Sequence, residues 1–124
     1  PNSVKIVMQT ADGRIWEMLG SSVGGGKVII SSINGMEIEF SGDYPTIITL
    51  HRDQPGAVAQ VSEILSHYNI NIAFLKVFRS SRGSDASMVI ECDHEVAPEL
   101  LDEIRALQVI KEVMFINAGI IQAK

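Results

Sequence analysis

Residues 45–78 read PTIITLHRDQPGAVAQVSEILSHYNINIAFLKVF, and this stretch decides the fold. It opens with an apolar run over residues 45–51 that is typical of a short strand. The loop Asp53-Gln54-Pro55-Gly56 then predicts a helix start, with Asp53 as the N-cap and Pro55 in the first turn. The apolar residues that follow keep helical spacing to about residue 68; they are Val58, Val61, Ile64, Leu65 and Tyr68.

The rest of the chain continues this pattern. After Asn69 closes the helix, a second strand is expected from Asn71 through Phe78, and a third follows a turn at residues 81–84. Pro98 begins a second helix, and residues 109–116 form the last strand. The order βαββαβ predicts an α+β fold, a ferredoxin-like sandwich with two helices on one face of a sheet.

The first 42 residues are a different kind of segment, because they hold seven of the ten glycines. Alternating apolar residues and the turn signals Asp12-Gly13 and Asn34-Gly35 predict β-hairpins with about four short strands, and residues 20–26 read as a glycine-rich loop. So small a sheet needs a partner to cover its apolar face. We therefore interpret residues 1–42 as the end of a larger β-rich domain, residues 43–117 as the βαββαβ domain and residues 118–124 as a tail.

The composition excludes several classes of function. A net charge of −5, from 10 basic and 15 acidic residues, disfavours nucleic acid as a partner. Residues 88–90 also lack the aromatic side chains on which RNA-binding domains of this fold stack bases. The single cysteine, Cys92, excludes an internal disulfide and an all-cysteine metal site. The sequence shows no long apolar run and no signal-peptide pattern, so we expect no membrane span and a cytoplasmic location.

The sequence offers no recognisable catalytic constellation. Its three histidines, His51, His67 and His94, fall on different predicted elements without metal-ligand spacing. Cys92 follows the apolar register of a strand, where a buried inert thiol is expected. The run Gly24-Gly25-Gly26-Lys27 lacks the earlier glycine and the following Ser or Thr of a phosphate-binding loop. A turn that requires positive φ angles is the favoured interpretation of this run, and a backbone anion site is the alternative.

The loop before the first helix is the candidate for binding. Free backbone N–H groups in a first helical turn favour a carboxylate, and Gly56 allows close approach. Asp53 and His51 supply partners for an amino group, and Asn71 offers a donor and an acceptor. Each of these side chains also has an ordinary structural role open to it, as a cap, a strand end or a turn.

The first helix separates these residues. It spans about 20 Å and runs antiparallel to the first strand, so its start and its end lie at opposite edges of the sheet. One small ligand therefore cannot contact Asp53 and Asn71 of the same chain. If both residues bind one molecule, the site lies between two chains.

The motif His51-Arg52-Asp53-Gln54-Pro55-Gly56, the helix after it and Asn69-Ile70-Asn71-Ile72-Ala73 resemble the ACT domain, a small-molecule-binding regulatory module. The resemblance covers about residues 44–117 and implies an amino acid, often serine, bound between two ACT domains of a homodimer. By position, the implied ligand contacts fall on His51, Asp53, Gly56, Asn71 and Ile72. The sequence looks most similar to the ACT domains of D-3-phosphoglycerate dehydrogenases, which have Asn where this chain has Asp53, and of iron–sulfur L-serine dehydratases.

The stretch Gly20-Ser21-Ser22-Val23-Gly24-Gly25-Gly26 resembles the β subunit of L-serine dehydratases, where it belongs to the allosteric substrate-binding domain. The resemblance implies that residues 1–42 are the end of that domain and that this chain is regulatory, with no catalytic residue and no cofactor of its own. Conversion of L-serine to pyruvate and ammonia, and the iron–sulfur cluster, are then expected on a catalytic α subunit or on a domain missing from this chain. Two alternatives stay open: a structural dimerisation module with an empty ACT site, and the ACT end of a D-3-phosphoglycerate dehydrogenase.

Overall fold

The computed structural model describes residues 3–9, 13–79 and 84–117. The first part of the chain contains β1 (Ser3–Gln9), β2 (Ile15–Gly24), β3 (Lys27–Ile33) and β4 (Met36–Phe40). The second part contains β5 (Thr46–Arg52), α1 (Ala57–His67), β6 (Ile72–Arg79), β7 (Asp85–Cys92), α2 (Pro98–Arg105) and β8 (Ile110–Ile116). Three predicted features lie wholly or partly outside the described residues: the turn at Asp12, most of the turn at residues 81–84, and the tail at residues 118–124.

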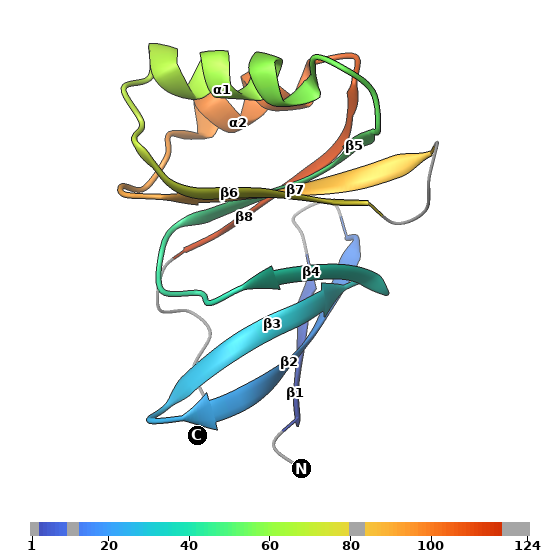
Figure 1. Ribbon diagram of the computed structural model, residues 1–124, viewed down its shortest axis with the longest axis vertical. Coiled ribbons are helices and arrows are strands. Elements are labelled where there is room, and N and C mark those ends of the chain that lie inside the picture. The colour runs from blue at the N-terminus through green and yellow to red at the C-terminus, as the bar shows by residue number, and fades with distance from the viewer. Residues whose placement is uncertain (1–2, 10–12, 80–83, 118–124) are drawn as a thin grey trace.

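The second part has the predicted ferredoxin-like architecture. Its four strands form an antiparallel sheet in the order β6-β7-β5-β8, and both helices lie on the same face of this sheet (Figure 1). Ala57, Val61 and Leu65 of α1 and Leu100 and Ile104 of α2 are buried against it. The α+β prediction and the order βαββαβ are therefore confirmed.

The first four strands form a separate sheet, in the order β1-β2-β3-β4, which covers the other face of the ferredoxin-like sheet (Figure 1). One apolar core joins the two sheets. Its buried members from the first sheet are Trp16, Met18, Val28, Ile30, Ile33, Ile38 and Phe40, and from the second Ile48, Val89, Met114 and Ile116. The partner that the hairpin sheet needs is thus the second part of the same chain.

The ferredoxin-like sheet is buried on both faces as a result. Along β5, Ile47 packs toward the helices and its neighbour Ile48 packs toward the hairpin sheet. Along β7, every residue from Ala86 to Cys92 is buried. Because both faces are covered, even the polar residues of these strands are buried, among them Thr46, Thr49, Ser87 and Glu91.

The prediction of a loop over residues 20–26 is wrong for its first part. Strand β2 continues through Gly24 and pairs with β3, with register shifts at Leu19/Gly20 and at Ser22/Gly24. Gly20 pairs with Ile30 of β3, and this position requires glycine because a Cβ there would lie 2.5 Å from the carbonyl oxygen of Ile29. Only Gly25 and Gly26, with φ of +63° and +77°, form the turn between the strands.

The predicted Asn34-Gly35 hairpin is confirmed. Both residues have positive φ, 47° and 79°, as a type I′ turn requires. The side-chain Oδ1 of Asn34 also accepts a hydrogen bond from the N–H of Glu17 at 2.7 Å, which ties the turn to β2. Within the described ranges, no helix is both long and apolar enough to cross a membrane.

The shared core predicts that the two sheets unfold together. Met18 is fully buried in this core, so Met18→Ala should lower the free energy of unfolding by about 2–5 kcal/mol. Trp16, the only tryptophan, reports the hairpin sheet by fluorescence, and far-ultraviolet ellipticity reports the helices. We expect both signals to shift to the same lower denaturant midpoint in this variant.

The control is Val7→Ala, at a valine that is 58% exposed on the same sheet, which should change stability by less than about 0.5 kcal/mol. A helix signal that keeps its wild-type midpoint in Met18→Ala would contradict the shared core.

Candidate ligand-binding site

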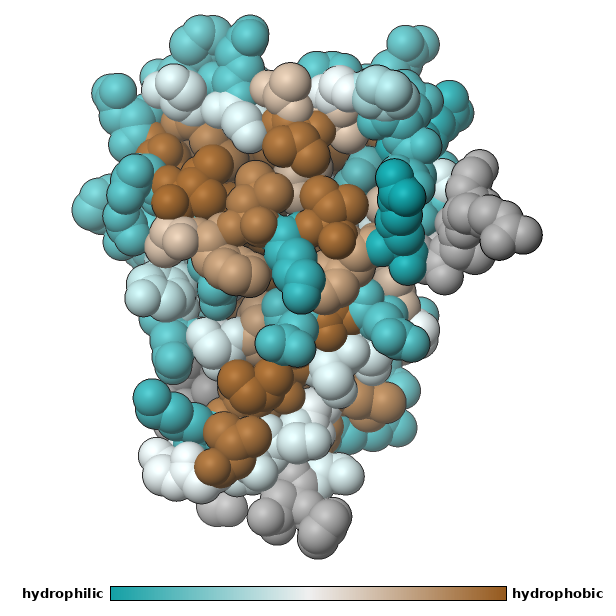
Figure 2. Space-filling view, viewed as in Figure 1, coloured by the Kyte–Doolittle hydropathy of each residue, from teal (hydrophilic) through white to brown (hydrophobic). Residues whose placement is uncertain are grey.

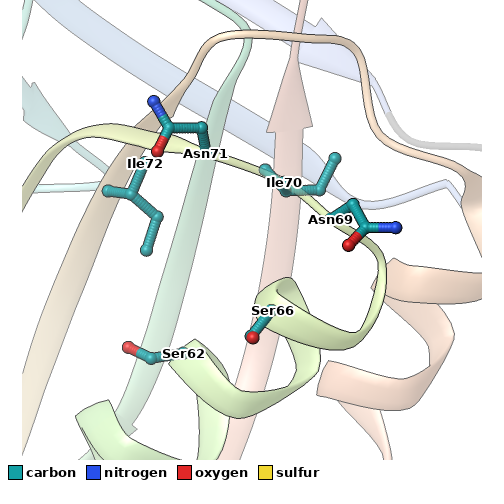
Figure 3. A pocket seen from close by; sticks show the side chains of 6 residues that line it. All are labelled: Ser62, Ser66, Asn69, Ile70, Asn71 and Ile72. Atoms are coloured by element: carbon teal, nitrogen blue, oxygen red, sulfur yellow. The ribbon is translucent and has the colours of Figure 1, made fainter.

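A polar pocket lies where the C-terminal half of α1 faces the start of β6. Its volume is about 450 Å³. The lining residues are Ser62, Ser66, Asn69, Ile70, Asn71 and Ile72 (Figure 3). Hydroxyl and amide groups dominate this surface, and the six lining residues include no charged side chain. The pocket thus offers hydrogen bonds to a small polar molecule without a fixed charge at its wall.

The end of α1 places residues 69–72 at this pocket. Asn69 adopts a left-handed conformation with φ of 57°. Its N–H donates to Ser66 O at 3.0 Å, and the N–H of Ile70 donates to Leu65 O at 3.0 Å. These two bonds are those of a Schellman motif, which satisfies the last helical carbonyls and turns the chain sharply into β6.

Asn71 is held by the residue that follows β7. Its side-chain Nδ2 donates to Oδ2 of Asp93 at 2.5 Å, and the backbone N–H of Asp93 donates to Asn71 O at 3.1 Å. In Figure 3 the amide nitrogen of Asn71 points away from the two serines, and its oxygen lies on the side nearer Ser62. Asn71 therefore presents an acceptor to the pocket.

Ser62 and Ser66 were not anticipated from the sequence as site residues. They stand one helical turn apart on α1 and line the pocket opposite residues 69–72, with the hydroxyl of Ser66 directed toward Ser62 (Figure 3). A signal was available, because residues four apart lie on one face of a helix. Val58, Ser62 and Ser66 share such a face beside the core positions Ala57, Val61 and Leu65.

The other predicted site residues lie near the start of α1. Asp53 does not cap the helix as predicted: the N-cap is Gly56, with φ of +96° and no side-chain cap. The carboxylate of Asp53 instead pairs with Arg79 at the end of β6, with Nε to Oδ2 at 3.0 Å, and its N–H donates to Ser84 O at 2.9 Å. These contacts tie the loop to the neighbouring strands β6 and β7.

His51 is buried, with 2% of its surface exposed, on the helix-facing side of β5. Its Nδ1 lies 3.4 Å from Oγ1 of Thr49. Burial lowers the pKa of this imidazole below its ordinary value of 6.5, while Asp53 and Asp85 act in the opposite direction. His51 is therefore in its neutral form at neutral pH.

The structure thus brings together only part of the predicted set. Asn71 and Ile72 line the pocket, whereas His51, Asp53 and Gly56 are not among its lining residues. The 11 residues of α1 separate the two groups, which corresponds to about 16 Å. The assignment of these five residues to one site shared by two chains stays a prediction.

An exposed apolar edge lies beside the pocket. Strand β6 is the outer strand of its sheet, and Phe74 and Val77 on it are 45% and 36% exposed. Val58 of α1 is 39% exposed. Figure 2 shows apolar side chains gathered on the face over which β6 and α1 lie in Figure 1. Val77 pairs with the buried Met88 and so lies on the helix side of the sheet. Phe74 lies on the hairpin side, where it lines a hollow with Ile29 and Phe40. We call these exposed side chains along the two faces of this edge, Val58, Phe74 and Val77, the β6 edge patch.

A family model, that of the ACT domain, matches residues 46–108. The chain belongs to the ACT domain family. The pocket and the β6 edge patch therefore lie on an ACT domain, and the hairpin sheet covers the face of this ACT domain that its own helices leave free.

Relatives match most of the ACT domain chain, including its hairpin sheet. A probable L-serine dehydratase beta chain of Bacillus subtilis is 37% identical over 113 residues, 91% of this chain and 51% of the relative. The L-serine dehydratase beta chain of Peptoniphilus asaccharolyticus is 34% identical over 87% of this chain and 49% of its own. The chain thus spans about half the length of these two relatives.

A D-3-phosphoglycerate dehydrogenase of Methanocaldococcus jannaschii is 31% identical over 94% of this chain and 22% of its own length. That match covers 116 residues, so it extends through most of the hairpin segment as well as the ACT domain. The hairpin segment alone therefore does not separate dehydratases from dehydrogenases. The identities of 37% and 34% favour the dehydratase resemblance.

The remaining predicted features of the ACT domain chain have structural roles. Gly24, Gly25 and Gly26 all have the positive φ that the turn interpretation expected, although Gly24 is the last residue of β2 and only Gly25 and Gly26 form the turn. Cys92 is fully buried, and burial raises the pKa of its thiol to about 11, as expected for an inert side chain. The described part of the chain contains no group of three or more His, Cys, Asp or Glu residues arranged to hold a metal ion.

His51 makes the stability of this ACT domain depend on pH. Because its pKa is lowered on folding, the unfolded chain binds a proton at a pH where the folded chain does not. The free energy of unfolding should therefore fall as the pH drops from about 6.5 toward the pKa of His51 in the folded chain. Above about pH 6.5, the imidazole is neutral in both states and His51 causes no such loss of stability. His51→Gln should remove this part of the dependence, measured as the difference in denaturant midpoint between about pH 7.5 and about pH 5.5.

The control is His67→Gln, at an exposed histidine of α1, which should keep the wild-type pH dependence. An unchanged pH dependence in His51→Gln would contradict the assignment of a buried neutral imidazole.

Proposed function

We propose that this chain is the regulatory, non-catalytic part of an L-serine dehydratase and that it binds L-serine, or a similar small amino acid, between two ACT domains. The observation that carries the proposal is the hydroxyl- and amide-lined pocket beside an exposed apolar sheet edge. The similarity to L-serine dehydratase beta chains over about nine-tenths of the chain supports the enzyme class.

The pocket favours a small polar amino acid over an apolar one. The hydroxyl groups of Ser62 and Ser66 can each donate and accept, and so can meet the hydroxyl of a serine. Asn71 presents an oxygen to a ligand N–H group. A purely apolar side chain would leave these groups without partners in a closed site, which costs free energy.

The missing half of the site is expected from a second copy. The lining residues include no basic side chain that could neutralise a ligand carboxylate. The first turn of α1 after Gly56 offers free backbone N–H groups of the kind that bind carboxylates, but it lies a helix length away in the same chain. Pairing of two copies through the β6 edge patch would cover the apolar side chains that flank the pocket.

The chemistry of the reaction is assigned to another polypeptide or domain. One cysteine, fully buried, cannot hold an iron–sulfur cluster, so the cluster and the conversion of L-serine to pyruvate and ammonia belong to a catalytic α subunit or domain. This chain would act on it through the serine-dependent association of ACT domains. A cytoplasmic location goes with this metabolic role.

A second candidate is the ACT end of a D-3-phosphoglycerate dehydrogenase, favoured by the 31% identity over 94% of the chain to the relative from Methanocaldococcus jannaschii. Serine is the expected ligand here too, and the domain joined to this chain distinguishes the two. A nucleotide-binding domain would identify the dehydrogenase.

Binding of L-serine to the full 124-residue chain tests the proposal directly. Titration calorimetry should show saturable binding at millimolar or lower concentration. Asp53→Ala and Asn71→Ala should each weaken it about tenfold or more, because each removes a hydrogen-bonding group from one half of the site. Asp102→Ala, which removes an exposed carboxylate from α2, should bind as the wild type does.

No heat and no thermal stabilisation with L-serine or any other amino acid would contradict the ligand proposal. Wild-type binding that survives both Asp53→Ala and Asn71→Ala would place the ligand elsewhere and favour a structural dimerisation module with an empty ACT site.

The β6 edge patch predicts a dimer in solution. Val77→Lys puts a charge on the β6 edge patch and should convert a dimer into a monomer in sedimentation experiments, with loss of L-serine binding. Leu19→Lys is the matched control, because Leu19 is 43% exposed on the hairpin sheet, away from β6. A wild-type chain that stays monomeric at high concentration with L-serine, or a Val77→Lys variant that stays dimeric, would contradict the shared site.

A further inference from the structure

The side chain of Asn71 has two possible orientations at the pocket, and Asp93 selects one of them. An ionised carboxylate only accepts hydrogen bonds, so the amide group that faces it must be the NH₂ group. The 2.5 Å contact from Asn71 Nδ2 to Asp93 Oδ2 has this polarity. The backbone bond from Asp93 N–H to Asn71 O, at 3.1 Å, holds the two residues in register.

We propose that Asp93 is a positioning residue: it turns the oxygen of Asn71 into the pocket, so that the ligand is bound with its ammonium group toward Asn71 and its carboxylate away from it. This inference rests on the proposed function of the pocket and deepens it by stating the direction of the ligand.

The charges around Asn71 and Asp93 favour a ligand whose ammonium group points toward Asn71. Asn71 presents the negative end of its amide dipole, and Asp93 adds a full negative charge behind it. A ligand carboxylate placed there would meet repulsion and no donor from the Asn71 side chain, whereas an ammonium group would donate to Asn71 Oδ1 in a charge-assisted hydrogen bond. A site built in this way distinguishes an α-amino acid from the corresponding α-hydroxy acid, which carries no positive charge.

The experiment compares L-serine with L-glycerate, in which a hydroxyl replaces the ammonium group. Titration calorimetry on the full chain should give at least tenfold tighter binding of L-serine in the wild type, about 1.4 kcal/mol. In Asp93→Ala and in Asp93→Asn, whose side chain can donate as well as accept, this preference should fall several-fold. Glu95→Ala removes a similarly exposed carboxylate two residues away and should keep the wild-type preference.

A double-mutant cycle separates positioning from direct contact. If Asp93 acts through Asn71, Asp93→Ala should cost little in an Asn71→Ala background, where the amide is already gone. An equal loss of affinity in both backgrounds, or an equal loss for L-serine and L-glycerate, would overturn the proposal.

A second readout does not depend on the ligand. The side-chain NH₂ resonances of Asn71, measured by nuclear magnetic resonance, should shift and their protons should exchange faster with water in Asp93→Ala, and both should stay unchanged in Glu95→Ala. If the wild type binds no amino acid, the proposed function fails, and this measurement still decides whether Asp93 holds the amide. Unchanged Asn71 resonances in Asp93→Ala would show that it does not.

Discussion

The burial of one sheet on both of its faces is the constraint on which the rest of this structure depends. The sheet β6-β7-β5-β8 packs against its two helices on one face and against the hairpin sheet on the other. Successive residues of β5 belong in turn to the two apolar cores, and β7 is buried from Ala86 to Cys92. The expected boundary at residues 42 and 43 falls in the connection between β4 and β5. The hairpin sheet nevertheless shares its core with the ACT domain, so both contribute to one packed unit.

Periodicity and turn chemistry were sufficient to predict the elements whose signals are local. The helical spacing after Gly56, the alternation near Cys92 and the Asn34-Gly35 turn all led to the correct structure. The strand character of residues 20–24 was missed, because glycine and serine resemble a loop in sequence while their pairing with β3 is a long-range contact. The N-cap assignment of Asp53 failed for the same kind of reason: its carboxylate is taken by Arg79, at the far end of another strand.

The candidate site was only partly accessible from the sequence. Asn71 and Ile72 were predicted and line the pocket, but the contribution of Ser62 and Ser66 to its wall depends on how α1 is rotated over the sheet. Asp93 contacts Asn71 because the pairing of Ile72 with Cys92 brings the end of β7 beside the start of β6. This pairing between distant residues could not be predicted from local sequence signals. His51, Asp53 and Gly56 remain a helix length from the pocket within one chain. A ligand that joins these two groups would make association of two chains depend on its concentration, which is a physical basis for regulation.

The central claim is that the loop at residues 53–56 and the turn at residues 69–72 form one site between two copies of the chain. Backbone amide shifts of the isotope-labelled chain, followed during titration with L-serine, test it most directly. We expect amides in both segments to shift together along a single saturation curve, in a particle with the mass of a dimer. Shifts confined to one segment, or two segments that saturate at different concentrations, would contradict it.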